Sequence, residues 1–156
     1  VSCYKKNKEF VMSWIRIWVH LVFSTKNREP FLLKSVKASI IDHIKENAKS
    51  KNIWIDEING WNDHIHILIS LGKDQSISKI AQLIKGESSN WINKNKLTKT
   101  HFAWQDDYWA VSLSESHLAD LRNYILNQEI HHKKITFNEE VENFMKKYGW
   151  KYLESN

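Results

Sequence analysis

The sequence predicts an α+β protein with a ferredoxin-like sandwich, in which an antiparallel sheet carries helices on one face and further helices follow at the C-terminal end. The length of 156 residues fits one domain, at about 150 residues per domain. Hydrophobic residues at 42% and charged residues at 26% are ordinary globular values, which exclude a disordered or fibrous chain. Four glycines and one proline supply too few turns for an all-β fold.

The first predicted strand runs from Trp14 to Ser24, where apolar residues alternate along the chain. Residues 1–11 show no periodicity, so we expect an extension or a tag there and a single domain over residues 12–156. One face of the strand carries Ile15, Ile17, Val19, Leu21 and Phe23, and the other carries Arg16, Trp18, His20 and Val22. The polar stretch from Lys26 to Pro30 ends the strand.

A helix and a hairpin are predicted next. Helical spacing is shown by Leu33, Val36, Ile40, Ile44 and Ala48. The run from Ile53 to Trp61 predicts a second strand and that from Asp63 to Leu71 a third, with Gly60 assisting a short turn. The two strands should therefore pair with each other.

The second predicted helix begins at Ser76, a residue type that caps helices. Its buried stripe consists of Ile77, Ile80, Ala81, Ile84 and Trp91. Residues 72–99 contain six lysines and two acidic residues, so 6 minus 2 leaves a charge of +4. A basic segment of this kind indicates either a polyanionic partner or the solvated face of a helix.

The remaining chain predicts a final strand region and two more helices. The stretch from Phe102 to Leu113 is either one broken strand or a small hairpin. Ser114 can cap a helix that continues toward His132, and Thr136 with Glu139 forms a capping-box pattern before a helix that ends near Tyr148. The predicted order is β-α-β-β-α-β-α-α, which is the basis for the ferredoxin-like expectation.

The most informative local motif is His64-Ile65-His66. Residues two apart in a strand point to the same face, so both imidazoles can bind one cation. Ile65, Ile67 and Ile69 then face the core on the opposite side. A bare pair of surface or hydrogen-bonded histidines is the alternative interpretation of the motif.

A second set of polar groups, Tyr124 and Gln128, lies on the third predicted helix. Their spacing of four residues places a phenol and an amide on one helix face. Tyr124 alone would be an ordinary residue of an amphipathic helix. Together with a strand that carries two imidazoles, it becomes a candidate nucleophile.

Five stretches in this order resemble the single-tyrosine HUH transposases of insertion-sequence-200-like elements and their relatives associated with repeated extragenic palindromes. The stretches are residues 18–30, 63–66, 80–86, 102–112 and 124–128 with His131-His132 after them. The resemblance implies that His64 and His66 bind a metal, that Gln128 is the third ligand and that Tyr124 is the nucleophile. It also implies a homodimer that cuts and rejoins single-stranded DNA at hairpins of transposon ends.

The chemistry of these residues agrees with that implication. A free phenol has a pKa near 10, so a nearby cation must help to form or use the phenolate. Two imidazoles and one amide oxygen form a mixed nitrogen and oxygen site, for which we expect Mg²⁺ or Mn²⁺. Attack by Tyr124 on phosphorus would give a 5′-phosphotyrosine and a free 3′-hydroxyl, and a new 3′-hydroxyl could rejoin the strand without ATP.

Contacts to DNA phosphates are expected from the second helix and its flanking loops, and the candidate residues are Arg16, Lys26, Arg28 and Lys85. Arg16 has the alternative of being only a charge at a strand edge. Trp91, Trp104 and Trp109 can stack on bases, although each is individually expected in the core. His131 and His132 are expected on the surface near a helix end, with the alternative that they orient Gln128 or contact a phosphate. His20 is expected either beside the metal face or in a core hydrogen bond.

Two other functions fit the same residues. A metal-dependent phosphoesterase or nuclease would use His64 and His66 to activate water, and a domesticated repressor would bind DNA without cutting it. The sequence also leaves open whether Tyr124 completes the histidine site of its own chain or of a partner. The lone Cys3 and the lack of a long apolar run suggest a cytoplasmic protein without a membrane span.

Overall fold

Four antiparallel strands form the central sheet of this protein, for which a computed structural model describes residues 14–148 except the side chains of Phe137, Phe144, Met145 and Tyr148. The expected extension over residues 1–11 lies outside the described residues. The strands are β1 (Ile17–Ser24), β2 (Trp54–Gly60), β3 (His64–Leu71) and β4 (Trp109–Leu113), in the order β2-β3-β1-β4. This order, with β1 and β3 in the centre, is that of a ferredoxin-like sheet, as predicted.

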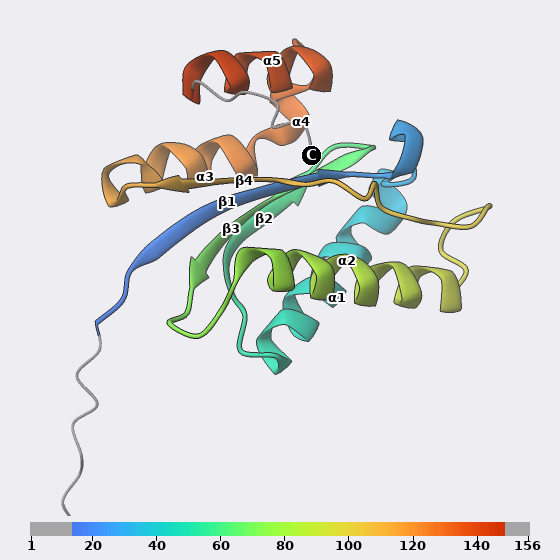
Figure 1. Cartoon of the computed structure of the whole chain (residues 1–156). Helices are drawn as coiled ribbons and strands as arrows, with labels where there is room; N and C mark the ends of the chain where they lie inside the picture. Colours follow the sequence, from blue (N-terminus) through green and yellow to red (C-terminus); the bar gives the residue numbers. More distant parts are fainter. Residues whose placement is uncertain (1–13, 149–156) are drawn as a thin grey trace, which may run out of the picture.

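Helices cover both faces of the sheet (Figure 1). The helices α1 (Lys34–Ser50) and α2 (Ile77–Lys94) lie on one face. The C-terminal helices α3 (Leu118–Leu126), α4 (Gln128–His131) and α5 (Phe137–Tyr148) lie on the other. Short 3₁₀ turns, η1 (Lys26–Arg28) and η2 (Glu115–His117), follow β1 and β4. The sheet therefore has two covered faces, one formed by the ferredoxin-like helices and one by the C-terminal segment.

The main core lies between the sheet and the pair α1 and α2. Alternate residues of β3, namely Ile65, Ile67 and Ile69, are fully buried there together with Leu21 of β1. Because side chains alternate along a strand, the residues of β3 between these isoleucines face the C-terminal helices. A second, smaller core on that side contains Trp18, Leu68, Leu118 and Ile125.

The predicted hairpin of β2 and β3 is confirmed, and Gly60 is essential to its geometry. Ile58 pairs with Ile67, and Gly60 with Ile65. A β-carbon at Gly60 would lie 2.2 Å from the carbonyl oxygen of His64, too close for any atom pair of this kind. The turn therefore brings the backbone of β2 directly against the start of β3.

Two of the three predicted helix caps are confirmed, whereas the Ser114 cap is wrong, because its side chain forms no capping hydrogen bond and α3 begins only after His117. The hydroxyl of Ser76 accepts a hydrogen bond from the backbone N–H of Lys79 at 3.3 Å. At the start of α5, the N–H of Thr136 donates to Glu139 Oε2 at 2.7 Å, and the N–H of Glu139 donates to Thr136 Oγ1 at 3.3 Å. These reciprocal bonds form the capping box, and they fix where α5 begins.

The final strand region is one broken strand rather than a hairpin. Trp104 forms an isolated antiparallel bridge with Thr25, and β4 pairs with β1 further along, from Val22 opposite Trp109 to Trp18 opposite Leu113. Trp104 lies in the core, where its Nε1–H donates to Ser88 Oγ at 2.9 Å. The core interpretation of this tryptophan is therefore correct.

Two details of the predicted helices are wrong. Leu33 is 53% exposed and precedes α1, whereas Lys37 is buried because its ammonium donates to the carbonyl of Gly60 at 3.0 Å. The predicted single helix from Ser114 toward His132 is interrupted at Asn127, whose side-chain N–H donates to the carbonyl of Asn123 at 2.8 Å. Among residues 14–148, no helix is both long and apolar enough to cross a bilayer.

Candidate active site

The site lies on the sheet face that the C-terminal helices cover. His64 and His66 point there from the first residues of β3, and both side chains are fully buried. Their ring centroids are 5.1 Å apart, with the rings nearly perpendicular. The alternation that sends Ile65 into the main core thus brings both imidazoles to one place, as the sequence predicts.

An ion pair behind His64 fixes the orientation of its ring. Nδ1 of His64 lies 2.7 Å from Asp63 Oδ1, and Arg28 binds the other carboxylate oxygen at 2.7 Å through Nη2. Burial lowers the pKa of His64, and the bond with Asp63 opposes that effect. Burial would raise the pKa of Asp63, but its hydrogen bonds from His64 and Arg28 lower the pKa overall. Asp63 is therefore an anion that holds the Nδ1–H of His64 and directs Nε2 into the site.

His20 plays the corresponding part for His66. Its Nε2 lies 3.0 Å from Nδ1 of His66, and the two rings stack with centroids 5.2 Å apart. Burial lowers the pKa of His20 to about 4 and that of His66 well below its usual value. Both rings are therefore neutral at pH 7. His20 satisfies both expectations made for it, since it lies beside the histidine face and forms a buried hydrogen bond.

Tyr124 comes to the same place from α3. Its ring lies edge-on to that of His66, with centroids 5.5 Å apart, and its hydroxyl is 3.3 Å from Nε2 of His131. The tyrosine also lines a cavity of about 520 Å³ between β4 and α3, together with His20 and Lys147. One chain therefore brings the phenol to its own histidine pair.

Gln128, the predicted third ligand, is fully buried at the start of α4. Its Nε2–H donates to the carbonyl of Tyr124 at 3.2 Å, across the break in the helix. Its side chain also interacts with His64, where it raises the pKa. The amide is thus adjacent to the histidine pair, although a helix break rather than a continuous helix places it there.

Two further residues of the site, His132 and Glu140, are missed by the sequence analysis. The expectation that His132 lies on the surface is wrong, because its side chain is 2% exposed and its Nε2 lies 3.0 Å from Nε2 of His64. Glu140 of α5 is also 2% exposed. Burial raises the pKa of Glu140 to about 8 and lowers that of His132 to about 4. The adjacent histidines His131 and His132 are a sequence pattern that could have indicated a further metal ligand, whereas no local pattern marks Glu140.

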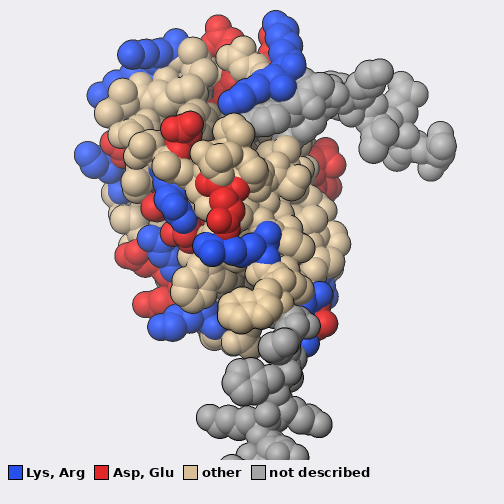
Figure 2. All heavy atoms as spheres, turned by 90° about the vertical axis from the view of Figure 1, so that its left-hand side faces the viewer, with Lys and Arg blue, Asp and Glu red and all other residues tan. Residues whose placement is uncertain are grey.

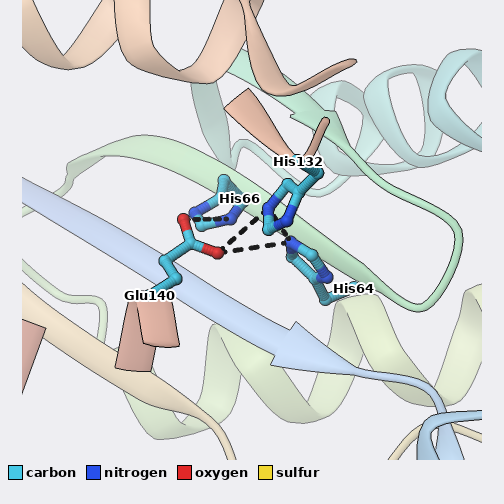
Figure 3. Close-up of side chains that lie close together, drawn as sticks. All are labelled: His64, His66, His132 and Glu140. Atoms are coloured by element: carbon cyan, nitrogen blue, oxygen red, sulfur yellow. Dashed lines mark hydrogen bonds and ion pairs between the residues drawn. The ribbon is translucent and has the colours of Figure 1, made fainter. Parts of the chain in front are cut away.

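The side chains of this cluster point at one another from three parts of the chain (Figure 3). Oε2 of Glu140 lies 3.1 Å from Nε2 of His132, and Oε1 lies 3.4 Å from Nε2 of His66. Among the described residues, the buried atoms His66 Nε2, Gln128 Oε1 and both Glu140 oxygens have no hydrogen-bond partner. Buried polar atoms of this kind are costly unless something pairs with them. The donor set therefore fits a divalent cation.

The four residues expected to contact DNA lie in different settings. Arg16 is largely exposed and pairs with Glu115, and Arg28 is occupied with Asp63. Lys85 donates to the carbonyl of Asp106 at 2.6 Å, and Lys26 is exposed. On the face shown in Figure 2, basic side chains are interspersed with acidic ones and do not form one continuous basic patch.

The sheet order is that of a ferredoxin-like fold. On it, a buried cluster of histidines that could bind a metal ion lies beside a tyrosine, which defines the class of site. The family profile described as IS200-like transposase matches residues 13–128. The chain belongs to the IS200-like transposase family. A curated relative, the ISDra2 transposase TnpA of Deinococcus radiodurans, is 25% identical over 130 residues, which are 80% of this chain and 90% of the relative.

Two solved structures show the same fold. A crystal structure of a candidate transposase from Deinococcus radiodurans R1 has a TM-score of 0.62 at 21% identity, and covers 75% of this chain and 94% of that one. A tyrosine transposase associated with repeated extragenic palindromes, bound to such a hairpin, has a TM-score of 0.60 at 16% identity and covers 100% of this chain and 94% of that one. At these identities the likeness supports the fold, and the predicted family and fold class are confirmed.

Proposed function

We propose that this transposase cuts and rejoins single-stranded DNA through a 5′-phosphotyrosine on Tyr124. The observation that carries the proposal is the position of Tyr124, whose ring lies 5.5 Å from that of His66 within one chain. A half-buried phenol that packs against a metal-competent imidazole pair beside an open cavity is suited to attack on a bound phosphodiester. His64, His66 and Gln128 would hold a divalent cation, Mg²⁺ or Mn²⁺, which neutralises charge on the phosphate when it is bound.

Each protein group has a defined part in the transfer. The Tyr124 hydroxyl gives its proton to Nε2 of His131, at 3.3 Å, as its oxygen forms a bond to phosphorus. The bond from phosphorus to the 3′-oxygen breaks, and that oxygen takes up a proton. The products are a 5′-phosphotyrosine and a 3′-hydroxyl, so one phosphodiester replaces another. Attack by a new 3′-hydroxyl reverses these steps and joins a different strand.

The surroundings of the site support a strand that passes through it. The cavity beside Tyr124 includes Lys147, and a second hollow of about 360 Å³ beside His132 includes Arg28, Lys133 and Lys134. Basic groups on both sides of the histidines suit a phosphate backbone. We retain Arg16, Lys26, Arg28 and Lys85 as proposed DNA contacts. The hairpin in the complex of the palindrome-associated relative supports hairpin ends as the substrate.

A labelled single strand that carries a hairpin, incubated with Mg²⁺ or Mn²⁺ and separated on a denaturing gel, tests the proposal. We expect a covalent adduct with the protein, which Tyr124→Phe abolishes while DNA binding is kept. The matched control is Tyr108→Phe, because Tyr108 lies at a separate cavity along α2. Free 5′-phosphate ends without an adduct would instead indicate a nuclease, and tight binding without cleavage would indicate a repressor.

A homodimer remains part of the proposal. Because Tyr124 already meets the histidine pair of its own chain, each subunit of a dimer could act alone. Mixing His64→Ala chains with Tyr124→Phe chains tests this arrangement. Activity that appears only in the mixture would show that subunits exchange the tyrosine helix, whereas an inactive mixture agrees with the site within one chain.

A further inference from the structure

His132 and Glu140 lie beyond residues 13–128, the part of the chain that matches the transposase family. Even so, their ligand atoms and those of His64 and His66 all lie within 4.8 Å of one another (Figure 3). The four side chains are between 0% and 2% exposed. The C-terminal segment therefore adds two metal-competent groups to a site that the family pattern describes with fewer.

Hydrogen bonds determine which nitrogens of two rings carry hydrogen. Nδ1 of His64 lies 2.7 Å from a carboxylate oxygen of Asp63, and Nδ1 of His132 lies 3.2 Å from the carbonyl oxygen of Ile135. Because both oxygens can only accept, both Nδ1 atoms must donate. In the neutral rings, the two Nε2 atoms therefore present lone pairs to each other at 3.0 Å. Such a contact is repulsive unless a positive charge lies between the two atoms.

In its ionised form, Glu140 adds a third acceptor to the same space. Its Oε2 lies 3.1 Å from Nε2 of His132 and 3.6 Å from Nε2 of His64. Neither of its oxygens has a hydrogen-bond partner among the described residues. A buried carboxylate without donors is strongly unfavourable, and removal of the carboxylate or addition of a cation would relieve the cost.

We propose that His132 and Glu140 are ligands of the same divalent cation as His64 and His66, so that the cation joins α5 to the central sheet. Ligands at about 2.1 Å from one centre lie about 3.0 to 3.4 Å from one another, the spacing of octahedral or tetrahedral sites. Four contacts between these ligand atoms, at 3.0 to 3.6 Å, are close to that spacing, and because the four groups lie within 4.8 Å of one another, they need to draw only slightly closer around an ion. Three imidazoles and one carboxylate, together with the amide oxygen of Gln128, suit first-row transition ions such as Mn²⁺, Fe²⁺, Co²⁺ or Zn²⁺.

This inference rests on the proposed function in one respect, because both place the same divalent cation at His64 and His66. If it holds, α5 contributes to the site through Glu140, and a substrate phosphate shares the cation with a carboxylate. Metal binding should then change the order of α5 as well as the chemistry of the site. This consequence can be measured without DNA.

The test is a titration of the full chain with Co²⁺, followed by the visible absorbance of the ion and by calorimetry. Glu140→Gln keeps the size of the side chain and removes the charge, and should lower the Co²⁺ affinity at least about 10-fold. His132→Gln should do the same and change the absorbance spectrum. Glu142→Gln, an exposed position of the same helix, is the matched control and should bind as the wild type does.

Amide hydrogen exchange over residues 137–148 gives a second readout. We expect Co²⁺ to slow exchange in α5 of the wild type and of Glu142→Gln, and to have no such effect in Glu140→Gln. Melting curves in EDTA show whether each variant is folded, and the removal of a buried charge should not unfold Glu140→Gln. Affinities of both site variants within two-fold of the wild type, with unchanged exchange, would overturn the inference.

The outcomes separate this inference from the proposed function. If the Tyr124 adduct forms and Co²⁺ binds equally in wild type and both variants, the inference fails and the proposed function stands. If the variants lose Co²⁺ and the wild type forms no adduct, the metal site is supported and the phosphotyrosine is not. If the wild type binds no Co²⁺ by any readout, the ligand assignment of His132 and Glu140 is wrong.

Discussion

The hydroxyl of Tyr124 lies 3.3 Å from Nε2 of His131, a residue that α4 turns back toward the end of α3. The two rings meet edge-on, with centroids 4.8 Å apart. A hydrogen-bond acceptor beside a phenol is the arrangement that a proton transfer needs, because the base must reach the proton that it removes. The break at Asn127 makes this contact possible.

Replacing His131 with glutamine should slow adduct formation roughly 100-fold at pH 7 and leave DNA binding unchanged, because the amide cannot take the phenol proton. The defect should shrink as the pH approaches 10, where the phenol ionises without help. Single-turnover gels over a series of pH values measure both effects.

The control for this variant is His43→Gln, a histidine of α1 on the opposite face of the sheet, where it pairs with Glu87. It should retain the wild-type rate. An equal loss in both variants, or a defect in His131→Gln that stays constant with pH, would argue against a base at His131.

Asp63→Asn should lower the affinity for Co²⁺ or Mn²⁺ about 10- to 100-fold, because the carboxylate holds the Nδ1–H of His64 and thereby directs Nε2 to the cation. The variant also loses the ion pair with Arg28. Calorimetric titration with either metal gives the affinity.

Asp74→Asn is the matched substitution, since the Asp74 side chain is 85% exposed and remote from the histidines in the fold. It should bind the metal normally. Wild-type affinity in Asp63→Asn would show that the orientation of His64 does not depend on this carboxylate.

Gly60→Ala should destabilise the protein by at least about 1 kcal/mol and weaken metal binding, because the new β-carbon would meet the carbonyl oxygen of His64 at 2.2 Å. Gly86→Ala offers the opposite case within a helix. Among the described residues, no heavy atom outside the backbone of its own helix lies within 4 Å of its β-carbon position, so we expect a gain of about 0.5 to 1 kcal/mol. Urea unfolding gives both values, and a stabilised Gly60→Ala would contradict the proposed close approach.

The metal-free protein should lose stability as the pH rises from about 4.5 to about 8, because burial raises the pKa of Glu140 to about 8. The folded state keeps this carboxyl protonated after the unfolded chain has released its proton, so the contribution is complete below 4.5 and lost through 8. The loss is on the order of 5 kcal/mol at most. Glu140→Gln in EDTA should lack this slope.

Buried histidines act in the other direction at lower pH, because burial lowers the pKa values of His20, His64, His66, His131 and His132. The pKa values of His20 and His132 are lowered to about 4, so each contributes stability that is present above the usual value of 6.5 and lost as the pH falls toward 4. Because both proteins contain these histidines, the difference between wild type and Glu140→Gln isolates Glu140. Parallel pH profiles of the two proteins would refute the assigned shift.

Local patterns were sufficient for most of the fold. Alternation placed Ile65 in the core and His64 on the opposite face, and the capping residues Ser76 and Thr136 marked the starts of two helices correctly. The four-residue spacing placed Tyr124 and Gln128 on one helix face, and the family resemblance linked them to the histidine pair. These predictions succeeded because each depends on residues within one or two turns of the chain.

The missed features depend on distant contacts. Lys37 can be buried because its ammonium donates hydrogen bonds to the carbonyl of Gly60 and the carboxylate of Glu129. Neither partner can be inferred from the sequence of the helix itself. His132 looks like a polar residue at a helix end until α4 turns it toward His64. Glu140 follows the capping residue Glu139 and resembles it in sequence, yet one is buried and the other exposed.

By itself, the sequence predicted the order of strands and helices, the family through its resemblance, and a candidate site with a histidine pair and a tyrosine. Period, caps and motif spacing are local properties of a chain, so they can be found in its sequence. Only the tertiary structure decided that His20, Asp63, His132 and Glu140 surround that pair and that Tyr124 meets it within one chain. The physical reason is that burial and lone-pair geometry arise where separate segments exclude water together, and a one-dimensional pattern does not specify which segments meet.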